Sequence, residues 1–479
     1  MEPVFFCTKD NGTNERRESM KETNSTAPIR DARTLGVPKM MILGLQHMFA
    51  MFGATVLVPI LVNSYGLPLS IQTTLFFAGV GTLFFHVCTR MKVPAFLGSS
   101  FAFLGGFAAV AGLERGIYAG MAPAEKLQYA CGGIVVAGLL YVVLALIIKA
   151  VGVHKVMHYL PPVVTGPIII LIGLNLAPSA VNNASTCWWL ALVAMAIIIA
   201  ANIWGKGMIK IIPILLGVVG AYLVAVVANL AGVTTAAGAP LIDFASVRSA
   251  SLAGLQPFFT DFTGSVAKFD LSSVLVMAPI ALASMMEHIG DMSAISATVG
   301  ENFIEDPGLH RTLIGDGVAT SISAVFGGPA NTTYGENTGV LVLSRVYDPK
   351  VIRLAAVYAL ILSFSPKFAA VVNSMPAAIV GGVSFILYGM ISAIGVRNVV
   401  ENRVDFTNSR NLIIAAVILV CGLGFTGGLT FTVGGVSITL TSLAIAAIAG
   451  IVLNAVLPGN DFQFGQSEGA DTAASLGRY

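Results

Sequence analysis

Acidic side chains occur inside stretches that are otherwise apolar enough to lie in lipid. Glu287 and Asp291 stand four residues apart in APIALASMMEHIGDMSAI, so they share one face of a helix, with His288 about 100° away. Glu336 lies among glycines in NTTYGENTGVLVL, directly ahead of a Val/Leu run. Charged groups inside a bilayer are costly and rarely lie there without a function. These residues therefore mark a candidate site for binding a ligand or moving a proton.

The chemistry that this pattern favours is proton coupling. Two carboxylates that face one small cavity away from bulk water favour a bound proton, through desolvation and like-charge repulsion. Such groups could be loaded with a proton on one side of a membrane and unloaded on the other, with no metal and no nucleotide. The proton-coupling candidates are Glu287, His47, Asp291, Asp316 and Glu336.

Each of these residues also has a structural interpretation. Glu287 and Glu336 could cap a helix or pair with a buried base. Asp291 and Asp316 could lie near a membrane interface and stay solvated, and His288 could serve in packing. His47 is a stronger candidate, because it sits in the middle of an apolar run and matches the position of Glu287–His288 in the second half of the chain.

The composition predicts a membrane protein built from helices. Of 479 residues, 56% are hydrophobic and 10% are charged, and the mean hydropathy is +0.84. Soluble domains carry about a quarter charged residues. Apolar runs of roughly 20 residues, long enough to cross a bilayer, recur from Met40 to Leu457. The net charge of +2 and the absence of a basic patch do not indicate a nucleic-acid partner. The class is an all-α polytopic membrane protein in contact with the lipid bilayer.

The apolar runs predict about fourteen transmembrane spans. They are centred near residues 51, 80, 103, 138, 170, 196, 220, 283, 320, 341, 361, 384, 418 and 446. Lys and Arg gather in alternate loops, on the same side as the basic N-terminal segment, which the positive-inside rule makes cytoplasmic. We expect both termini to lie in the cytoplasm. The expected location is the plasma membrane, which in a bacterium is the inner membrane.

The order of the motifs indicates an inverted repeat. Gln46–His47 is followed about fifty residues later by the interrupted segment PAFLGSSFAFLGG, and Glu287–His288 is followed at a similar distance by ANTTYGENTG. Seven spans separate the two sets, an odd number, so the halves run in opposite senses through the membrane. This is the plan of many secondary transporters. Chance similarity of Gly-rich helices is the alternative.

The two interrupted segments predict short strands followed by half-helices in spans 3 and 10. Thr332, Thr333 and Tyr334 favour extended backbone, and Gly335 permits close approach of another group. We expect helix to resume around Asn337 and to run to Arg345. Irregular backbone at membrane depth is tolerated where it lines a cavity, and a half-helix aims its free N–H groups and positive dipole end there. Residues 99–101 would do the same from the opposite side.

Other classes of membrane protein fit the sequence less well. No GxxxxGK[ST] phosphate loop indicates ATP-driven pumping. The carboxylates mark single positions rather than a ring, which disfavours a channel. Nothing pairs a nucleophile with an activating base, so an enzyme is not predicted.

The motifs resemble the nucleobase–ascorbate transporter family, also called nucleobase:cation symporter family 2, with the uracil permeases most similar. The resemblance covers almost the whole membrane region and is carried by LQHMFAMFGATVLVPIL, PAFLGSSFAF, MMEHIGD, DPGLHR and NTTYGENTGVLVLSRVYD. The family signature is Gln, Glu or Pro, then Asn-x-Gly, four residues, then Thr and a basic residue or Gly. Here it runs from Glu336 to Arg345, with Ser344 in place of threonine.

This resemblance implies a core domain and a gate domain, with substrate between them, and a homodimer formed through the gate domains. The implied core segments are 39–150 and 270–370, and the implied gate segments are 151–232 and 371–457. Polar composition and charge placement predict a disordered cytoplasmic tail at 1–38, an extracellular loop at 233–269 and a cytoplasmic tail at 458–479.

The resemblance also implies a binding site. Glu287 accepts hydrogen bonds from the N–H edge of a base, and Glu336 adds a second carboxylate. Gly335 and Phe101 give backbone N–H groups to carbonyl oxygens, and the Phe101 ring stacks on the base. Ser100, Tyr334 and Asn337 complete the implied set.

Two features point to different bases. Glutamate as the first signature residue is similar to the uracil permeases, which favours proton-coupled import of uracil by alternating access. Asp291, where uracil permeases often have histidine, instead resembles purine-type members together with Asp316, so a proton-coupled xanthine or oxopurine permease is the alternative. Because Asp291 stands in place of that histidine, His47 or Glu287 itself is expected to carry the proton. The proton is the expected coupling ion, and no cofactor is expected. A sulfate-type anion transporter fits less well, because two carboxylates repel an anion.

Overall fold

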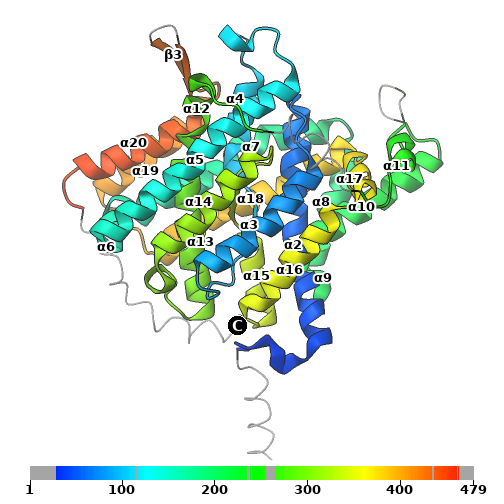
Figure 1. The fold of residues 1–479 in the computed structure, drawn as a ribbon, viewed down its shortest axis with the longest axis horizontal. Helices are drawn as coiled ribbons and strands as arrows, with labels where there is room; N and C mark the ends of the chain where they lie inside the picture. Colours follow the sequence, from blue (N-terminus) through cyan, green and yellow to red (C-terminus); the bar gives the residue numbers. More distant parts are fainter. Residues whose placement is uncertain are drawn as a thin grey trace, which may run out of the picture.

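The computed structural model describes residues 28–114, 116–234, 238, 240–254, 266–433, 436–460 and 462. The predicted tails 1–27 and 463–479, and parts of the predicted extracellular loop, lie outside the described residues. Helices make up most of the chain that is described (Figure 1).

The first half contains two groups of helices, and a short strand interrupts only the first group. The elements up to residue 159 are η1 (Ala32–Leu35), α2 (Val37–Ser64), α3 (Ile71–Cys88), β1 (Leu97–Ser99), η2 (Phe101–Phe103), α4 (Leu104–Ala111), η3 (Gly116–Tyr118), α5 (Pro123–Val151) and α6 (Val153–Tyr159). The elements that follow are α7 (Pro162–Ser185), α8 (Trp188–Ile203), α9 (Met208–Ile211), α10 (Pro213–Leu230) and α11 (Ala245–Ser249).

The second half again places a strand before a short helix. Its elements up to residue 344 are α12 (Leu271–Met277), α13 (Ile280–Val299), η4 (Ile304–Gly308), α14 (Leu309–Val325), β2 (Asn331–Thr333) and α15 (Gly335–Ser344). Those that follow are α16 (Pro349–Ser363), α17 (Pro366–Asn373), α18 (Ala377–Glu401), α19 (Ser409–Gly424), β3 (Leu429–Val433), β4 (Val436–Leu440) and α20 (Ser442–Val456).

Many of these helices are suited to a membrane. Among the described residues, seven helices are long and apolar enough to cross one, or up to eight if α16 and α17, bent by 87° at their junction, are one span. Shorter apolar helices include α8, α19 and α20. Every predicted span centre falls within a helix. The count of fourteen crossings and the inverted repeat stay predictions.

The two interrupted segments meet in space, although more than 230 residues separate them. Strands β1 and β2 pair antiparallel, with Leu97 opposite Thr333 and Ser99 opposite Asn331. Two flanking bonds extend the ladder: Ser100 N donates to Ala330 O at 2.8 Å, and Tyr334 N donates to Phe96 O at 3.0 Å. This pairing satisfies the backbone groups that a broken helix would otherwise leave unpaired at membrane depth. The prediction of short strands before half-helices is confirmed here.

The second half-helix begins earlier than predicted. Helix α15 starts at Gly335 rather than near Asn337, with Tyr334 as its extended N-cap residue, and ends before Arg345, which has a φ of 53°. The prediction was wrong because glycine imposes no side-chain constraint on the first helical position. Glu336 therefore belongs to the first turn of the helix.

The N-terminal segment is ordered from residue 28, so the prediction of disorder was wrong for residues 28–38. Ile29 forms a bridge beside Val346, in which its N–H donates to Arg345 O at 2.8 Å. The N–H of Ala32, itself fully buried, donates to Asp348 Oδ2 at 2.8 Å. Polar groups that the composition assigned to solvent thus find partners next to the end of α15.

A β-hairpin near the C-terminal end was not predicted. Strands β3 and β4 pair antiparallel, with Leu429 opposite Leu440. The β-branched residues of LTFTV and VSITL are a strand signal that the apolar count of spans hid.

Helices α7 and α18 pack closely along their lengths. A Cβ atom added at Gly395 of α18 would lie 2.6 Å from Ile170 N of α7 and 2.8 Å from Gly166 O. Small residues that let backbones approach are typical of helix contacts in membranes. The pair forms one wall of the site described next.

Candidate functional site

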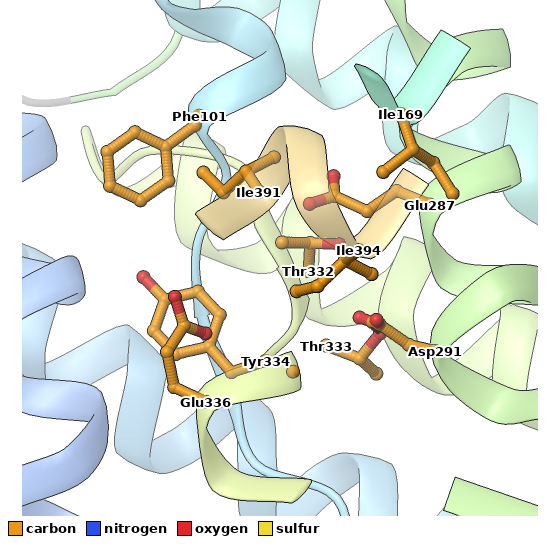
Figure 2. A pocket seen from close by; sticks show the side chains of 11 residues that line it. Phe101, Ile169, Glu287, Asp291, Thr332, Thr333, Tyr334, Glu336, Ile391 and Ile394 are labelled. Carbon is orange, nitrogen blue, oxygen red and sulfur yellow. Dashed lines mark hydrogen bonds between the residues drawn. The ribbon is translucent and has the colours of Figure 1, made fainter. Parts of the chain in front are cut away.

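A small, partly enclosed cavity lies between the β1–β2 region and the α7–α18 pair. Figure 2 shows its side chains around an open centre. Helix α13, the start of α15 and η2 form one side, and α7 and α18 form the other. The lining residues are Phe101, Ile169, Glu287, Asp291, Thr332, Thr333, Tyr334, Gly335, Glu336, Ile391 and Ile394.

Two glutamates from different helices face this cavity. Glu287 extends from α13 and Glu336 from the first turn of α15 (Figure 2). Glu287 Oε2 is buried and has no hydrogen-bond partner. A buried polar atom without a partner is costly, so its persistence indicates a ligand or a proton that completes it. No Lys, Arg or His forms an ion pair with either glutamate in the described part of the chain.

Backbone donors accompany the carboxylates. No side chain caps α15, so the N–H groups of its first turn and its positive dipole end are directed at the cavity. A Cβ atom at Gly335 would lie 3.2 Å from Ile394 Cδ1 and 3.6 Å from Asp291 Oδ1, which shows how near this backbone runs to the cavity wall. The site therefore offers acceptors and donors side by side.

Phe101 supplies an aromatic face. Phe101 is the first residue of η2. Ser100 is the N-cap residue of η2, but its side chain makes no capping hydrogen bond. The Phe101 ring lies edge-on to the ring of Tyr388 of α18, with centroids 5.9 Å apart and planes at 73°. A flat ligand could pack against this ring.

Asp291 and Tyr334 fix the strand that carries the site. Thr333 Oγ1 donates to Asp291 Oδ2 at 2.8 Å, which ties β2 to α13. The Tyr334 hydroxyl donates to Ser99 O at 2.9 Å and lies 3.3 Å from Thr55 Oγ1. Both residues line the cavity, but the hydroxyl of Tyr334 is already engaged by protein.

Asn337 and His47 form a pair outside the cavity lining. Asn337 Nδ2 lies 3.2 Å from His47 Nδ1 and donates to His47 O at 3.1 Å. The amide donates to Nδ1 in the tautomer of the neutral ring that carries its proton on Nε2. His47 Nε2 is buried and without a partner. The bond joins α15 to α2 through His47, which the sequence predicts to be a proton carrier.

Replacing Asn337 with aspartate is expected to destabilise the protein by about 1–3 kcal/mol, because a carboxylate cannot donate to His47 O or to Nδ1. Thermal unfolding of the purified protein in detergent measures this, with Asn182, an exposed residue of α7, changed to aspartate as the matched control. Equal melting temperatures for the Asn337→Asp variant and the parent would contradict the bond.

His288 and Asp316 form a second buried pair. His288 Nδ1 lies 2.9 Å from Asp316 Oδ2, and both side chains are fully buried. Neither residue lines the cavity, and neither does His47, Ser100 or Asn337. Ser100 Oγ lies 3.4 Å from Ser284 Oγ. Their predicted parts in binding or proton coupling stay predictions. Among the described residues, no three His, Cys, Asp or Glu side chains are placed to hold a metal ion.

The sequence matches the family described as the Permease family over residues 38–431. The chain belongs to this family. It is 41% identical over 440 residues to a uracil permease of Bacillus caldolyticus, covering 90% of this chain and 94% of that protein. It is 39% identical to a uracil permease of Bacillus subtilis (86% and 91%), and 38% identical to a putative pyrimidine permease, RutG, of Escherichia coli (87% and 89%). The resemblance found in the sequence is confirmed.

The permease shares its fold with solved transporter structures. The transmembrane domain of the cyanobacterium bicarbonate transporter BicA superposes with a TM-score of 0.56 at 16% identity, covering 89% of this chain and 99% of that one. A murine Solute Carrier 26 family member A9 structure in the inward-facing state gives 0.58 at 11% identity, with 95% and 76% covered. This permease is thus a mostly helical, multi-pass membrane protein and a transporter rather than an enzyme.

Five lining residues of the permease were not identified from sequence. Ile169 of α7 and Ile391 and Ile394 of α18 are apolar residues in apolar helices, so no sequence signal distinguishes them. Thr332 and Thr333 were placed in the strand but not in the cavity, and the bond of Thr333 to Asp291 was not predicted.

Proposed function

We propose that this permease imports uracil across the plasma membrane by proton symport through alternating access. The observation that carries the proposal is the buried, unpartnered Glu287 Oε2 in a cavity that also holds Glu336 and the uncapped start of α15. The relatives named uracil permease support the choice of a nucleobase.

The chemistry of uracil matches these groups. Its planar ring has two N–H donors and two carbonyl acceptors. Glu287 and Glu336 accept from N–H groups, and charge-assisted bonds of this kind are the stronger ones. Backbone N–H groups of Gly335 and Phe101 donate to the carbonyl oxygens, and the Phe101 ring covers one face of the base. The same backbone groups serve any base with this arrangement of donors and acceptors.

Proton coupling follows from the crowding of acids. Glu287, Asp291 and Glu336 all line one cavity without a cationic partner among the described residues. A bound proton relieves the repulsion between them. Glu287 holds that proton most directly, with His47, Asp291, Asp316 and Glu336 as further carriers.

Alternating access follows from where the cavity lies. Its lining comes from α13, β2, α15 and η2 on one side and from α7 and α18 on the other. Movement of the first group, the core, against the second, the gate, exposes the cavity to each side of the membrane in turn. A homodimer joined through the gate and cytoplasmic termini belong to this proposal.

An oxopurine such as xanthine is the second candidate substrate. Asp291 lines the cavity and bonds to Thr333, where it offers a further acceptor to a larger base. An anion is disfavoured, although solved anion transporters share the fold, because three carboxylates repel it.

Labelled uracil is expected to accumulate in proteoliposomes only when a proton gradient is directed inward. Unlabelled uracil should compete at least about tenfold better than xanthine, uric acid or ascorbate, because the relatives that support a nucleobase substrate are named uracil permeases. Uptake that does not depend on the proton gradient would contradict proton symport. Stronger competition by xanthine than by uracil would make xanthine the substrate.

A further inference from the structure

The motif DPGLHR, residues 306–311, plays no part in the cavity. It spans the end of η4 and the first turn of α14, where His310 and Arg311 follow Gly308, a residue that supplies no capping side chain. No acidic residue lies in this first turn. Positive side chains are unfavourable at a helix N-terminus, since the dipole there is already positive. A bound anion would stabilise this arrangement.

Further cations converge on the same place. Helix α14 packs against both α3 and α5, since a Cβ atom at Gly315 would lie 3.3 Å from Cys88 Cβ and one at Gly317 would overlap Tyr141 Cβ. Lys149 belongs to the last turn of α5, and Arg90 follows the end of α3. Arg311 Nη1 donates to Cys88 O at 3.4 Å, which anchors the guanidinium beside α3. Three helix ends thus bring their charges together.

Protein carboxylates do not neutralise this cluster. Among the described residues, none forms an ion pair with Arg90, Lys149 or Arg311. Asp306, the nearest acid of the motif, is paired with Lys92 at 2.5 Å. The neighbouring Glu305 is exposed and makes no ion pair with the cluster. The cluster is therefore free to pair with an anion from another molecule.

Apolar surface adjoins the charges. Helix α5 exposes Leu139, Val143 and Leu146, spaced three or four residues apart on one face, and Lys149 continues that face by three residues. At the end of α3, Val87 is 61% exposed. A lysine at the end of an apolar face extends its ammonium group to the interface. An anion that carries acyl chains would contact the charges and this apolar surface together.

We propose that Arg90, Lys149 and Arg311, together with the N-terminus of α14, bind the phosphate group of an anionic phospholipid on the side of the membrane where Lys and Arg gather. Arginine pairs with phosphate through two parallel hydrogen bonds, and a helix N-terminus adds backbone donors. Basic pockets between helices on the cytoplasmic side bind lipid headgroups in this way. The lipid fastens the ends of α3, α5 and α14 to one another.

The test uses full-length protein purified in detergent, titrated with short-chain phosphatidylglycerol and followed by native mass spectrometry. The triple variant R90Q/K149Q/R311Q is expected to bind this lipid roughly 100-fold more weakly than the parent. The control K39Q/K206Q/K210Q removes three charges from exposed lysines elsewhere and should bind as the parent does. Equal loss in both variants, or no loss in either, overturns the site.

Two further arms separate the possible anions. Phosphatidylcholine is zwitterionic, because its choline group balances the charge of the phosphate, so it should bind more weakly than phosphatidylglycerol. Inorganic phosphate should not compete with phosphatidylglycerol. Competition by inorganic phosphate would overturn the lipid in favour of a free anion. If the triple variant does not fold, Lys149→Gln alone is compared with Lys210→Gln, with an expected loss of about fivefold. Binding is measured without transport, so failure of the uracil proposal leaves this test intact.

Discussion

Glu287→Gln is expected to reduce uracil uptake by at least about 100-fold, because the amide replaces an accepting oxygen with a donor and removes the charge. Hydrogen bonds to charged groups contribute about 1.5–3 kcal/mol each, and an N–H of the substrate would now face another N–H. Glu287 Oε2 has no protein partner, so nothing else in the structure accounts for its carboxylate. Initial rates of labelled uracil uptake in proteoliposomes measure the effect.

Glu125→Gln is the matched control, since it makes the same chemical change on the surface. Glu125 is 40% exposed and pairs with Lys268 at 2.7 Å. Surface ion pairs contribute about 0–1 kcal/mol, so uptake by this variant should stay within about twofold of the parent. Comparing the two variants distinguishes the effect of losing a carboxylate at the site from the general effect of losing one negative charge.

A second measurement separates loss of the site from loss of the fold. The thermal midpoint of Glu287→Gln should equal or exceed that of the parent, because the change removes a buried charge that has no partner. Uracil should raise the midpoint of the parent but not of the variant. Full uptake by Glu287→Gln would remove this residue from the site.

The features of the site that the sequence predicted are those with a strong local cause. Carboxylates in apolar runs stand out because hydrocarbon excludes charge, which singled out Glu287, Asp291 and Glu336. The β-branched pair Thr332–Thr333 ahead of Gly335 predicted a strand and a new helix start, because those residue types favour extended backbone and glycine permits either conformation. The structure brings all of these residues to one cavity.

The features that the sequence did not predict depend on partners distant in the chain. Ile391 looks like any lipid-facing isoleucine until α18 is packed on α7. Residues 28–38 have the composition of a flexible tail, and only the partner groups at Arg345 and Asp348 order them. The start of α15 was misplaced by two residues, because the sequence alone does not fix which residue after a strand turns first.

Gly98→Ala is expected to lower stability by about 1–3 kcal/mol and to reduce uracil uptake by at least about tenfold. A Cβ atom at residue 98 would overlap the ring of Tyr334 and lie 2.7 Å from its hydroxyl oxygen. The ring cannot yield easily, because its hydroxyl is bonded to Ser99 O and its N–H to Phe96 O. Thermal unfolding and uptake rates measure the two effects.

Gly105→Ala is the control for this change, because a Cβ atom there meets nothing within 4 Å. Residue 105 lies in α4, where alanine is favoured over glycine by up to about 1 kcal/mol, so this variant should be as stable as the parent or more so. Normal uptake by Gly98→Ala would show that Tyr334 can move without disturbing its neighbours.

The reason to expect loss of uptake, beyond loss of stability, is the position of Tyr334 in the chain. Tyr334 is the N-cap residue of α15, and the next two residues, Gly335 and Glu336, supply a backbone donor and a carboxylate to the cavity. A displaced ring shifts the start of that helix, and a misplacement near 1 Å is enough to cost on the order of 100-fold in a positioned site. The binding geometry therefore depends on the missing side chain at residue 98 as much as on the acids that contact the substrate.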